Sequence, residues 1–414
     1  MIVTAQDVED AAARLAGVVA PTPVERSPRL SERIGGDVLL KREDLQVVRS
    51  YKVRGAYNVI SQLSDAARAK GVVCASAGNH AQGLAYVCSA LGVSGKVFLP
   101  RTTPRQKRDR IAVLGGDVVE VLLVGDTYDD AAAAALADAA QTGATLVPAF
   151  DAPGTVAGQG TVLAEAFAQL AVVPHVVVLP VGGGGLLAGA VTWLGARHPG
   201  VRVVGVEPAG AACMAAALAA GEPVRLDSLD GFVDGAAVRR AGDVTFPIVR
   251  DSGCELVAVA EGRVCTEMLA LYQSDGIIAE PAGALAAAAL DDVVHVEAGQ
   301  TVLVVLSGGN NDVSRYAEVV ERALVHEGRK HYFLVEFPQE PGALRGFLDD
   351  VLGPDDDITL FEYVKRSNRE TVPALVGIEL GAPEDLPALL ARMDAAPPEC
   401  QPVPPDSPLF RFLL

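Results

Sequence analysis

Short apolar runs alternate with alanine-rich stretches from Asp37 to about Glu321, and this alternation constrains the fold more than any other feature of the chain. Several runs are apolar at nearly every position, as in strands that helices cover on both faces. A strand followed by a helix, repeated many times, builds a parallel sheet. The expected strands are DVLLK, GVVCAS, KVFLP, DVVEV, HVVVLP, VRVVGVE, ELVAV and TVLVVL, which could form one sheet or two.

The sequence changes character after Arg322, where the polar stretch LVHEGRKH begins. It is followed by HYFLVEF, a helical stretch at 342–352, DITLFEYVK and VPALVGIEL. Alternating apolar residues in the first and last of these strands, each followed by a helix, predict a separate α+β domain of the split βαβ type. The segment PPECQPVPPDSP is expected to be a loop before a last short strand.

Composition excludes several classes of function. The 52 acidic residues outnumber the 34 lysines and arginines, and the net charge of −18 would repel nucleic acid and anionic membrane surfaces. The six cysteines lack metal-ligand spacing, so we expect free thiols in a reducing compartment, the cytoplasm. The uncharged run at 166–196 could imitate a membrane span, but Pro174, Pro180 and four glycines interrupt it. We expect a helix end, a buried strand, a loop and a helix there.

Lys52 follows a polar turn, at the start of a helix predicted to run from Arg54 to Leu63. A helix N-terminus disfavours an ammonium group, and burial would lower the pKa of the amine further. These are the conditions for a lysine that forms a Schiff base. The alternative is an ordinary surface lysine, which is far more common.

The turn SAGNHAQG follows the strand GVVCAS and opens a helix. Its backbone N–H groups, from Ser76 onward, would point at an anion beyond the end of the strand. The alternative is a tight turn in which Asn79 caps the helix and His80 is simply packed.

Four glycines, Gly182 to Gly185, follow the strand HVVVLP and leave backbone donors open to a phosphate group. A dinucleotide loop is the alternative, because Gly183-x-Gly185-x-x-Ala188 is followed about 20 residues later by Glu207. Ser307 in SGGNND could bind a ligand from the end of TVLVVL, or belong to an ordinary turn.

In a parallel sheet, four of these turns would converge on one crevice at the carboxyl ends of the strands. They are Ser50–Lys52, Ser76–His80, Gly182–Leu186 and Ser307–Asn310. Together they resemble the fold type II pyridoxal-phosphate enzymes, whose α/β fold is like that of tryptophan synthase β. Over nearly the whole chain, the order of the motifs and their residues are similar to those of threonine dehydratases of the short biosynthetic type.

The resemblance implies a role for each motif. Lys52 in SYKVRG would hold pyridoxal 5′-phosphate covalently and take the Cα proton of the substrate. Ser307 would face the pyridine nitrogen, and Asn79 would contact the ring hydroxyl. The phosphate would be bound by Gly182, Gly183, Gly184, Gly185 and Leu186, and the substrate carboxylate by Ser76, Ala77, Gly78, Asn79 and His80. Glu207 and Glu280 receive no catalytic role.

The implied reaction is the conversion of L-threonine, with L-serine as a second candidate substrate, to a 2-oxo acid and ammonia by β-elimination of water. For threonine the product is 2-oxobutanoate, in the first committed step of isoleucine biosynthesis. The resemblance implies a large catalytic domain at 1–49 and 142–325, a small one at 50–141, and an ACT-like regulatory domain at 326–414 that binds isoleucine as an inhibitor. It also implies a homotetramer.

Two departures from related sequences stand out. Related serine racemases have a metal site that begins with a glutamate like Glu207, but Cys213 stands at the later acidic position. We therefore expect no metal site. Tyr51 takes the place of a phenylalanine, a tolerated aromatic change.

Three alternatives stay open. Serine dehydratase, serine racemase and threonine synthase share the same constellation, and only the ACT-like tail favours threonine dehydratase. An NAD-dependent oxidoreductase would use the glycine loop and Glu207 but leave Lys52 and Ser76–His80 without a role. A non-catalytic amino-acid sensor would need the tail but not Lys52.

Overall fold

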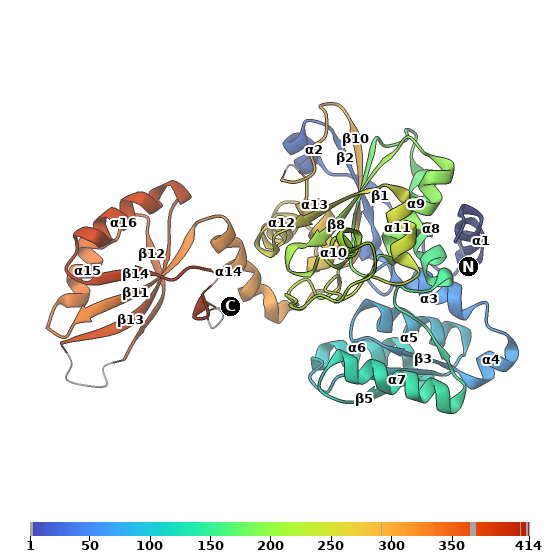
Figure 1. The fold of residues 1–414 in the computed structure, drawn as a ribbon. Helices are drawn as coiled ribbons and strands as arrows, with labels where there is room; N and C mark the ends of the chain where they lie inside the picture. The colour runs from blue at the N-terminus through green and yellow to red at the C-terminus, as the bar shows by residue number, and fades with distance from the viewer. Residues whose placement is uncertain (1–2, 291, 365–369, 406, 411–412, 414) are drawn as a thin grey trace. The chain divides into compact units, whose positions relative to one another are not determined.

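The computed structural model describes residues 3–290, 292–364, 370–405, 407–410 and 413. The chain forms two compact units, Met1–Asp312 and Val313–Leu414. Within the described residues, the first unit contains a six-stranded and a four-stranded sheet, and the second unit contains another four-stranded sheet (Figure 1). The eight strands expected before Arg322 therefore form two sheets rather than one.

The six-stranded sheet is parallel except at one edge. Its order is β1-β2-β10-β7-β8-β9, and only the short β1 runs antiparallel to its neighbour. The predicted parallel strands are confirmed, whereas β1 lies in a segment without a strand pattern. The strands are β1 (Val24–Arg26), β2 (Asp37–Arg42), β7 (Val176–Pro180), β8 (Arg202–Pro208), β9 (Glu255–Val259) and β10 (Thr301–Leu306).

Helices cover both faces of this sheet, which explains its apolar central strands. Val177 and Leu179 pack in one buried cluster with residues of α1, α8, α9 and α11. The helix α13 packs against β7, β8 and β10 from the opposite face (Figure 1). The helices are α1 (Ala5–Leu15), α2 (Pro28–Ile34), α8 (Pro153–Gln169), α9 (Gly185–Arg197), α10 (Cys213–Ala220), α11 (Thr245–Ser252), α12 (Glu261–Gln273) and α13 (Pro281–Ala288).

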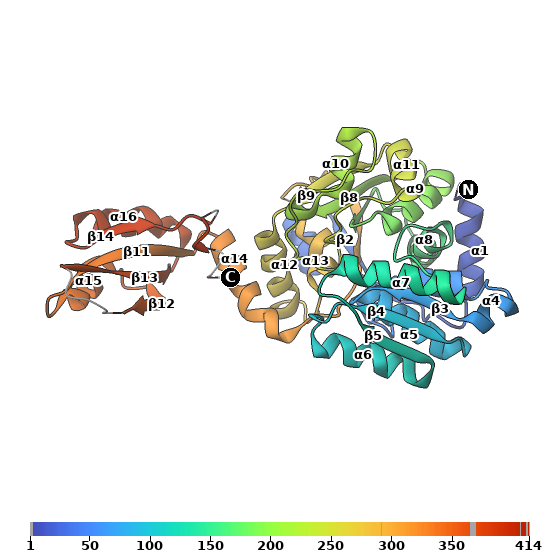
Figure 2. The ribbon, with the colours of Figure 1, turned by 60° about the horizontal axis from the view of Figure 1, so that its bottom comes forward.

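The four-stranded sheet of the first unit is wholly parallel, in the order β5-β4-β3-β6. Figure 2 shows α7 on one face and α5 and α6 on the other. The strands are β3 (Val72–Ala75), β4 (Gly95–Leu99), β5 (Val119–Leu123) and β6 (Thr145–Leu146). The helices are α3 (Lys52–Ile60), α4 (Asp65–Lys70), α5 (Asn79–Leu91), α6 (Arg105–Gly115) and α7 (Tyr128–Thr142).

This smaller sheet is inserted between β2 and β7 of the larger one. The chain leaves the larger sheet through a short 3-10 helix, η1 (Glu43–Leu45), and enters α3. It returns after β6 through residues 147–152 and continues into α8. The helix α3 packs against both α8 and α5, so it connects the two sheets.

The second unit has an antiparallel sheet in the order β12-β13-β11-β14, and a buried cluster contains residues of both its helices and its strands. Its element order confirms the split βαβ prediction. The elements are α14 (Tyr316–His326), β11 (Lys330–Pro338), α15 (Ala343–Val351), β12 (Asp357–Tyr363), β13 (Thr371–Glu379), α16 (Leu386–Ala395) and β14 (Glu399–Pro402).

Four further 3-10 turns lie in the two units. They are η2 (Gly116–Val118) and η3 (Ala209–Ala211) in the first unit, and η4 (Val313–Arg315) and η5 (Pro383–Asp385) in the second.

Three local predictions need correction. The helix expected from Arg54 to Leu63 begins at Lys52 and ends at Ile60, because Ser64 caps the next helix. The proline-rich segment near the C-terminus contains the last strand itself, since β14 pairs at the sheet edge, where proline is tolerated. The strand expected over DITLFEYVK ends at Tyr363, and its last residue, 365, lies outside the described residues.

The uncharged run at 166–196 folds as expected into the end of α8, the buried strand β7, a loop and most of α9. Among the described residues, none of the helices has the length and apolar character needed to cross a membrane.

Candidate active site

A cavity of about 820 Å³ lies in the first unit, within the usual size range of small-molecule sites. Its wall includes Lys52 and the turn Ser76–His80. Other parts of the wall are formed by Phe150 and by residues of the irregular segment 234–242. The site thus draws on residues that are far apart in the sequence.

Lys52 is the first residue of α3 and is half-buried in the wall of this cavity. Its Nζ donates a hydrogen bond to the backbone oxygen of Ala149, at 3.0 Å. Loss of water around the amine lowers the pKa of Lys52 to about 8, although the charge of Glu280 acts in the opposite direction. An amine with this pKa is partly neutral near pH 7, as a nucleophile must be.

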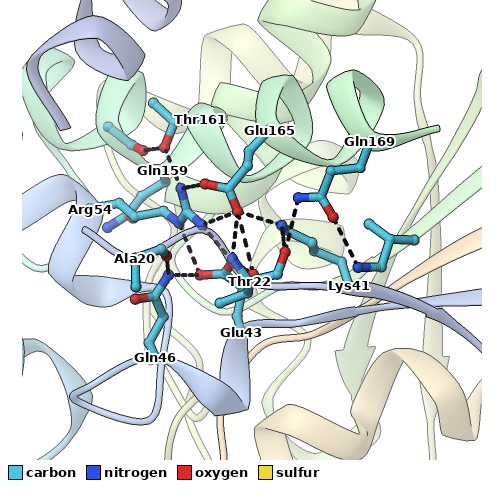
Figure 3. A network of polar contacts seen from close by, with 12 residues as sticks. Ala20, Thr22, Lys41, Glu43, Gln46, Arg54, Gln159, Thr161, Glu165 and Gln169 are labelled. Atoms are coloured by element: carbon cyan, nitrogen blue, oxygen red, sulfur yellow. Dashed lines mark hydrogen bonds and ion pairs between the residues drawn. The ribbon is translucent and has the colours of Figure 1, made fainter. Parts of the chain in front are cut away.

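A buried polar network fixes α3 two residues beyond Lys52 (Figure 3). The Arg54 guanidinium donates from Nε and Nη2 to both carboxylate oxygens of Glu43, at 2.9 and 2.7 Å. It donates to both oxygens of Glu165, at 2.9 and 3.0 Å, and to Thr161 Oγ1 at 3.3 Å. These contacts use all five of its N–H donors.

The network balances two cations against two carboxylates. Lys41 Nζ donates to Glu165 Oε1 at 2.5 Å and to the backbone oxygen of Thr22 at 2.6 Å. The Thr22 hydroxyl in turn donates to Glu43 at 2.6 Å. Because β2, η1, α3 and α8 each supply a charged group, the network fixes α3 relative to the larger sheet.

The turn Ser76–His80 joins β3 to α5, so it stands at the carboxyl end of a parallel strand and the N-terminus of a helix. The N–H groups of the first helical turn have no partner within the helix and favour a bound anion. Asn79 is the first residue of α5, not its cap, which is Gly78. The alternative interpretation of Asn79 as a capping residue is therefore wrong.

His80 is 2% exposed and packed, as expected for a histidine without a catalytic role. Its Nε2 lies 2.8 Å from the backbone oxygen of Val147, whereas Nδ1 has no partner among the described residues. Burial, with the charge of Lys52, lowers the pKa of His80 to about 4. The ring is therefore neutral at physiological pH.

The glycine loop Gly182–Gly185 connects β7 to α9, and its backbone requires glycine. Gly184 has φ +92°, a left-handed conformation that other residues rarely adopt. A Cβ on Gly183 would lie 2.3 Å from the Phe150 ring. Gly182–Leu186 do not line the cavity themselves, but Phe150 and Gly242, which contact the loop, do.

Ser307 follows β10 directly and is 3% exposed. Its Oγ donates to the backbone oxygen of Ala282 at 3.1 Å. Ser307 is not part of the cavity wall, whereas Asn310, three residues later, is. Of the four predicted turns, those containing Lys52, Ser76–His80 and Asn310 thus contribute to the wall, and the glycine loop lies next to it.

Glu280, which received no catalytic role from the sequence, is one of the acidic residues of the cavity wall. Glu280 is 4% exposed, caps the N-terminus of α13 and accepts a hydrogen bond from Asn79 Nδ2 at 2.5 Å. Burial, followed by the charge of Asp234, raises the pKa of Glu280 to about 7. A glutamate between apolar residues and a proline was the available signal.

Glu207 is engaged within the protein. Its carboxylate accepts hydrogen bonds from the backbone N–H groups of Met214 and Ala215, at 2.7 and 2.8 Å, at the start of α10. Burial raises the pKa of Glu207 to about 7. Cys213 Sγ lies 3.6 Å from the backbone oxygen of Gly182. In the part of the chain that the structure describes, no group of three or more His, Cys, Asp or Glu could hold a metal ion.

A lysine of lowered pKa at a helix N-terminus shares one cavity wall with a turn that joins a parallel strand to a helix, an arrangement suited to an enzyme that works through a lysine amine. Comparison with known proteins specifies the family. Residues 15–308 match the family of pyridoxal-phosphate dependent enzymes, and residues 321–413 match the C-terminal regulatory domain of threonine dehydratase.

The chain is 62% identical over 410 residues to the biosynthetic L-threonine dehydratase IlvA of Mycobacterium tuberculosis, covering 99% of this chain and 95% of that protein. The structure of threonine deaminase isoform 2 from Solanum lycopersicum matches with a TM-score of 0.72 and 39% identity, over 77% of this chain and 92% of that one. Maize serine racemase matches with a TM-score of 0.72 and 29% identity, over 79% and 99%. The chain belongs to the pyridoxal-phosphate dependent enzymes and, within them, to the threonine dehydratases that carry a C-terminal regulatory domain.

The residues present fit pyridoxal phosphate. Lys52 supplies a cavity amine that is partly neutral. His80 lies in the wall of the same cavity, and its buried Nδ1 has no partner among the described residues. The loop Gly182–Gly185 offers an N-terminal helix cradle, and a Cβ at Gly183 or Gly184 would collide with its surroundings.

Proposed function

We propose that this chain converts L-threonine to 2-oxobutanoate and ammonia by elimination of the β-hydroxyl, the first committed step of isoleucine biosynthesis, with L-serine as a second candidate substrate. One observation carries the proposal. The lysine that lines the cavity belongs to a chain 62% identical to a biosynthetic L-threonine dehydratase over 99% of its length.

In this proposal, Lys52 holds the cofactor, Asn79 contacts its ring hydroxyl, and Ser307 faces its ring nitrogen. Gly182–Gly185 and Leu186 bind its phosphate at the N-terminus of α9. The placement of Ser307 and the glycine loop immediately beside the cavity wall supports these roles. Position 307 holds a serine and not an acidic residue. A hydroxyl does not keep a ring nitrogen protonated as a carboxylate would, and this favours elimination.

When bound, pyridoxal phosphate withdraws electrons from Cα of the amino acid, so that a Cα proton and a β-hydroxyl can leave. The amine of Lys52 accepts the Cα proton in its neutral form. A pKa of about 8 keeps part of the Lys52 population neutral at physiological pH. The loop Ser76–His80 binds the substrate carboxylate through N–H groups at the start of α5, which orients Cα toward Lys52.

The second unit is proposed to bind isoleucine as a feedback inhibitor. Its match to the regulatory domain of threonine dehydratase and its βαββαβ order support this assignment. We also propose domains at 1–49 with 142–325, at 50–141 and at 326–414, and a homotetramer in the cytoplasm. None of the six cysteines, all of which lie in the described residues, forms a disulfide, which is consistent with a reducing compartment.

The test combines a spectrum with an assay. The purified protein should show the visible absorbance of bound pyridoxal phosphate and release 2-oxobutanoate from threonine, with inhibition by isoleucine. Lys52→Ala should lose both the band and the activity. Lys96→Ala is the matched control, because Lys96 is paired with Asp138 away from the cavity wall.

Other outcomes would redirect the assignment. A protein without the band would contradict the cofactor assignment to Lys52. A band with 2-oxo acid release from serine only would favour a serine dehydratase, and formation of D-serine would favour the activity named for the maize relative. Insensitivity to isoleucine would remove the proposed effector alone, and sedimentation of the same sample would decide the tetramer.

A further inference from the structure

The carboxylate of Glu280 occupies a space that the missing side chain of Gly308 leaves free, with Gly235 at ordinary contact distance. A Cβ on Gly308 would lie 2.1 Å from Glu280 Oε1, and a Cβ on Gly235 would lie 3.9 Å from the same atom. Glu280 is 4% exposed, so its oxygen requires a hydrogen-bond donor within the protein. Asn79 Nδ2 provides that donor at 2.5 Å.

The amide of Asn79 is held at both ends. Its Oδ1 accepts a hydrogen bond from Asn310 Nδ2 at 2.6 Å, and Asn310 Nδ2 also donates to the backbone oxygen of Val48 at 2.8 Å. If the Asn79 amide turned over, its oxygen would face the Glu280 oxygen and its NH₂ would face the NH₂ of Asn310. Both contacts would be repulsive, so the two partners fix one orientation.

We propose that Glu280 is a positioning residue of the cofactor site. It fixes the side-chain amide of Asn79 so that the NH₂ group points toward the ring hydroxyl that Asn79 contacts. An amide nitrogen carries two hydrogens, so one N–H engages Glu280 and the other is available to the ring hydroxyl. This inference rests on the proposed assignment of Asn79 to the ring. It concerns the electronic state of the ring, not the binding of the phosphate.

The charged groups around Glu280 make its hydrogen bond with Asn79 sensitive to pH. Asp234 approaches from segment 221–244, Lys107 from α6 and Lys52 from α3, with the hydroxyl of Tyr51 also close enough to interact. Burial and Asp234 raise the pKa of Glu280, whereas Asn79, Lys107 and Lys52 lower it, and the outcome is about 7. The ionised carboxylate is the stronger acceptor, so the hold on Asn79 is firmest above that pH.

The experiment is a double-mutant cycle on the holoenzyme. Visible spectra are recorded from about pH 6 to about pH 9 for the wild type, Glu280→Gln, Asn79→Ala and the double variant. Glu280→Gln should shift the pH midpoint of the cofactor band and lower kcat by up to about tenfold, the effect of exchanging a charge-assisted hydrogen bond for a neutral one, while the KM for threonine changes less than about threefold. In the Asn79→Ala background, Glu280→Gln should add nothing.

Controls separate this role from a loss of stability. Glu267 is equally buried but is paired with Arg29 and Arg33 outside the cavity wall, so Glu267→Gln should lower Tm without moving the spectral midpoint. If Glu280→Gln does not retain cofactor, Glu280→Asp keeps the acid, shortens its reach and should show the same non-additivity with Asn79→Ala.

Two results would overturn the inference: an unchanged spectrum in Glu280→Gln, or an equal shift whether or not Asn79 is present. Lys52→Ala distinguishes this failure from a failure of the proposed function. Loss of the band in Lys52→Ala together with an unchanged Glu280→Gln spectrum would reject only the role of Glu280. A band that survives in Lys52→Ala would reject the site assignment itself.

Discussion

Lys107 Nζ and Asp234 Oδ2 form an ion pair, 2.5 Å apart, between two segments that both line the cavity. Lys107 belongs to α6 of the smaller sheet, whereas Asp234 lies in the irregular segment that follows α10. A second pair, Arg225 with Asp129 at the start of α7, connects the same two regions at 2.7 Å. The two pairs hold the irregular segment against the smaller sheet.

Lys107→Ala should loosen the contact between the irregular segment and the smaller sheet. The KM for threonine should rise several-fold, with a smaller effect on kcat. Added salt should reduce the difference between variant and wild type, because both partners are partly exposed and the pair is screened. Steady-state kinetics at low and high ionic strength measure this effect. Arg105→Ala is the control on the same helix, since its pair with Asp109 is fully open to solvent. Equal KM changes in both variants would contradict the prediction.

The pKa of Lys52 should govern how fast the apoprotein captures pyridoxal phosphate. Only the neutral amine attacks, so the rate should rise with pH and level off above about 8, rather than near the ordinary value of 10.5. Because the folded protein lowers this pKa, the protonated Lys52 costs stability below about pH 8, and that cost is relieved as pH rises from about 8 to the ordinary value of 10.5. Glu280→Gln should move the midpoint lower, since the charge of Glu280 raises the pKa of Lys52. Stopped-flow absorbance on apoprotein provides the measurement.

Glu165→Gln should destabilise the first unit by about 3–5 kcal/mol, because it leaves the buried cations Lys41 and Arg54 with Glu43 as their only carboxylate partner in the network. Urea denaturation followed by the fluorescence of Trp193, which lies in the same unit, would report the loss. Asp251→Asn interrupts an exposed pair with Arg250 and should leave the midpoint unchanged. A Glu165→Gln midpoint equal to that of Asp251→Asn would show that the network contributes little.

Gly184→Ala should lower the affinity for pyridoxal phosphate by at least about tenfold. The added methyl group would strain a residue with φ +92° and would lie 2.4 Å from Met214 Cε, which distorts the proposed phosphate loop. Titration of apoprotein with pyridoxal phosphate measures the affinity. Gly195→Ala in the following helix meets open space and should bind the cofactor normally. Normal binding by Gly184→Ala would exclude this loop from the phosphate site.

The motifs that the sequence revealed are those whose chemistry depends on local backbone. Ser76–His80 and Gly182–Gly185 each join a strand to a helix, and the strand pattern with its glycines is visible without any tertiary information. The parallel sheets follow from the same alternation. The two strands of the first unit that went unpredicted, β1 and β6, have three and two residues, too short for a periodic pattern.

Contacts between distant residues could not be predicted in the same way. Glu280 meets Asn79 across 201 positions, and Lys52 meets Ala149 across 97. Ala149 carries no local signature and Glu280 only a weak one, its place between apolar residues and a proline, because burial and tertiary packing create their roles. The five-donor contact of Arg54 was equally invisible, since its acceptors come from η1 and α8.

Two segments of the chain connect the larger sheet to the smaller one. Lys52 lies in the segment that leads from the larger sheet into the smaller one, and Ala149 lies in the segment that leads back. Any rotation of the smaller sheet must turn about these two crossings. Displacement would then be least at the Lys52 amine and would grow toward the N-termini of α6 and α7, where Lys107 and Asp129 lie. Such a rotation would therefore leave the Lys52 amine nearly in place while the cavity wall at Lys107 and Asp129 moved farther.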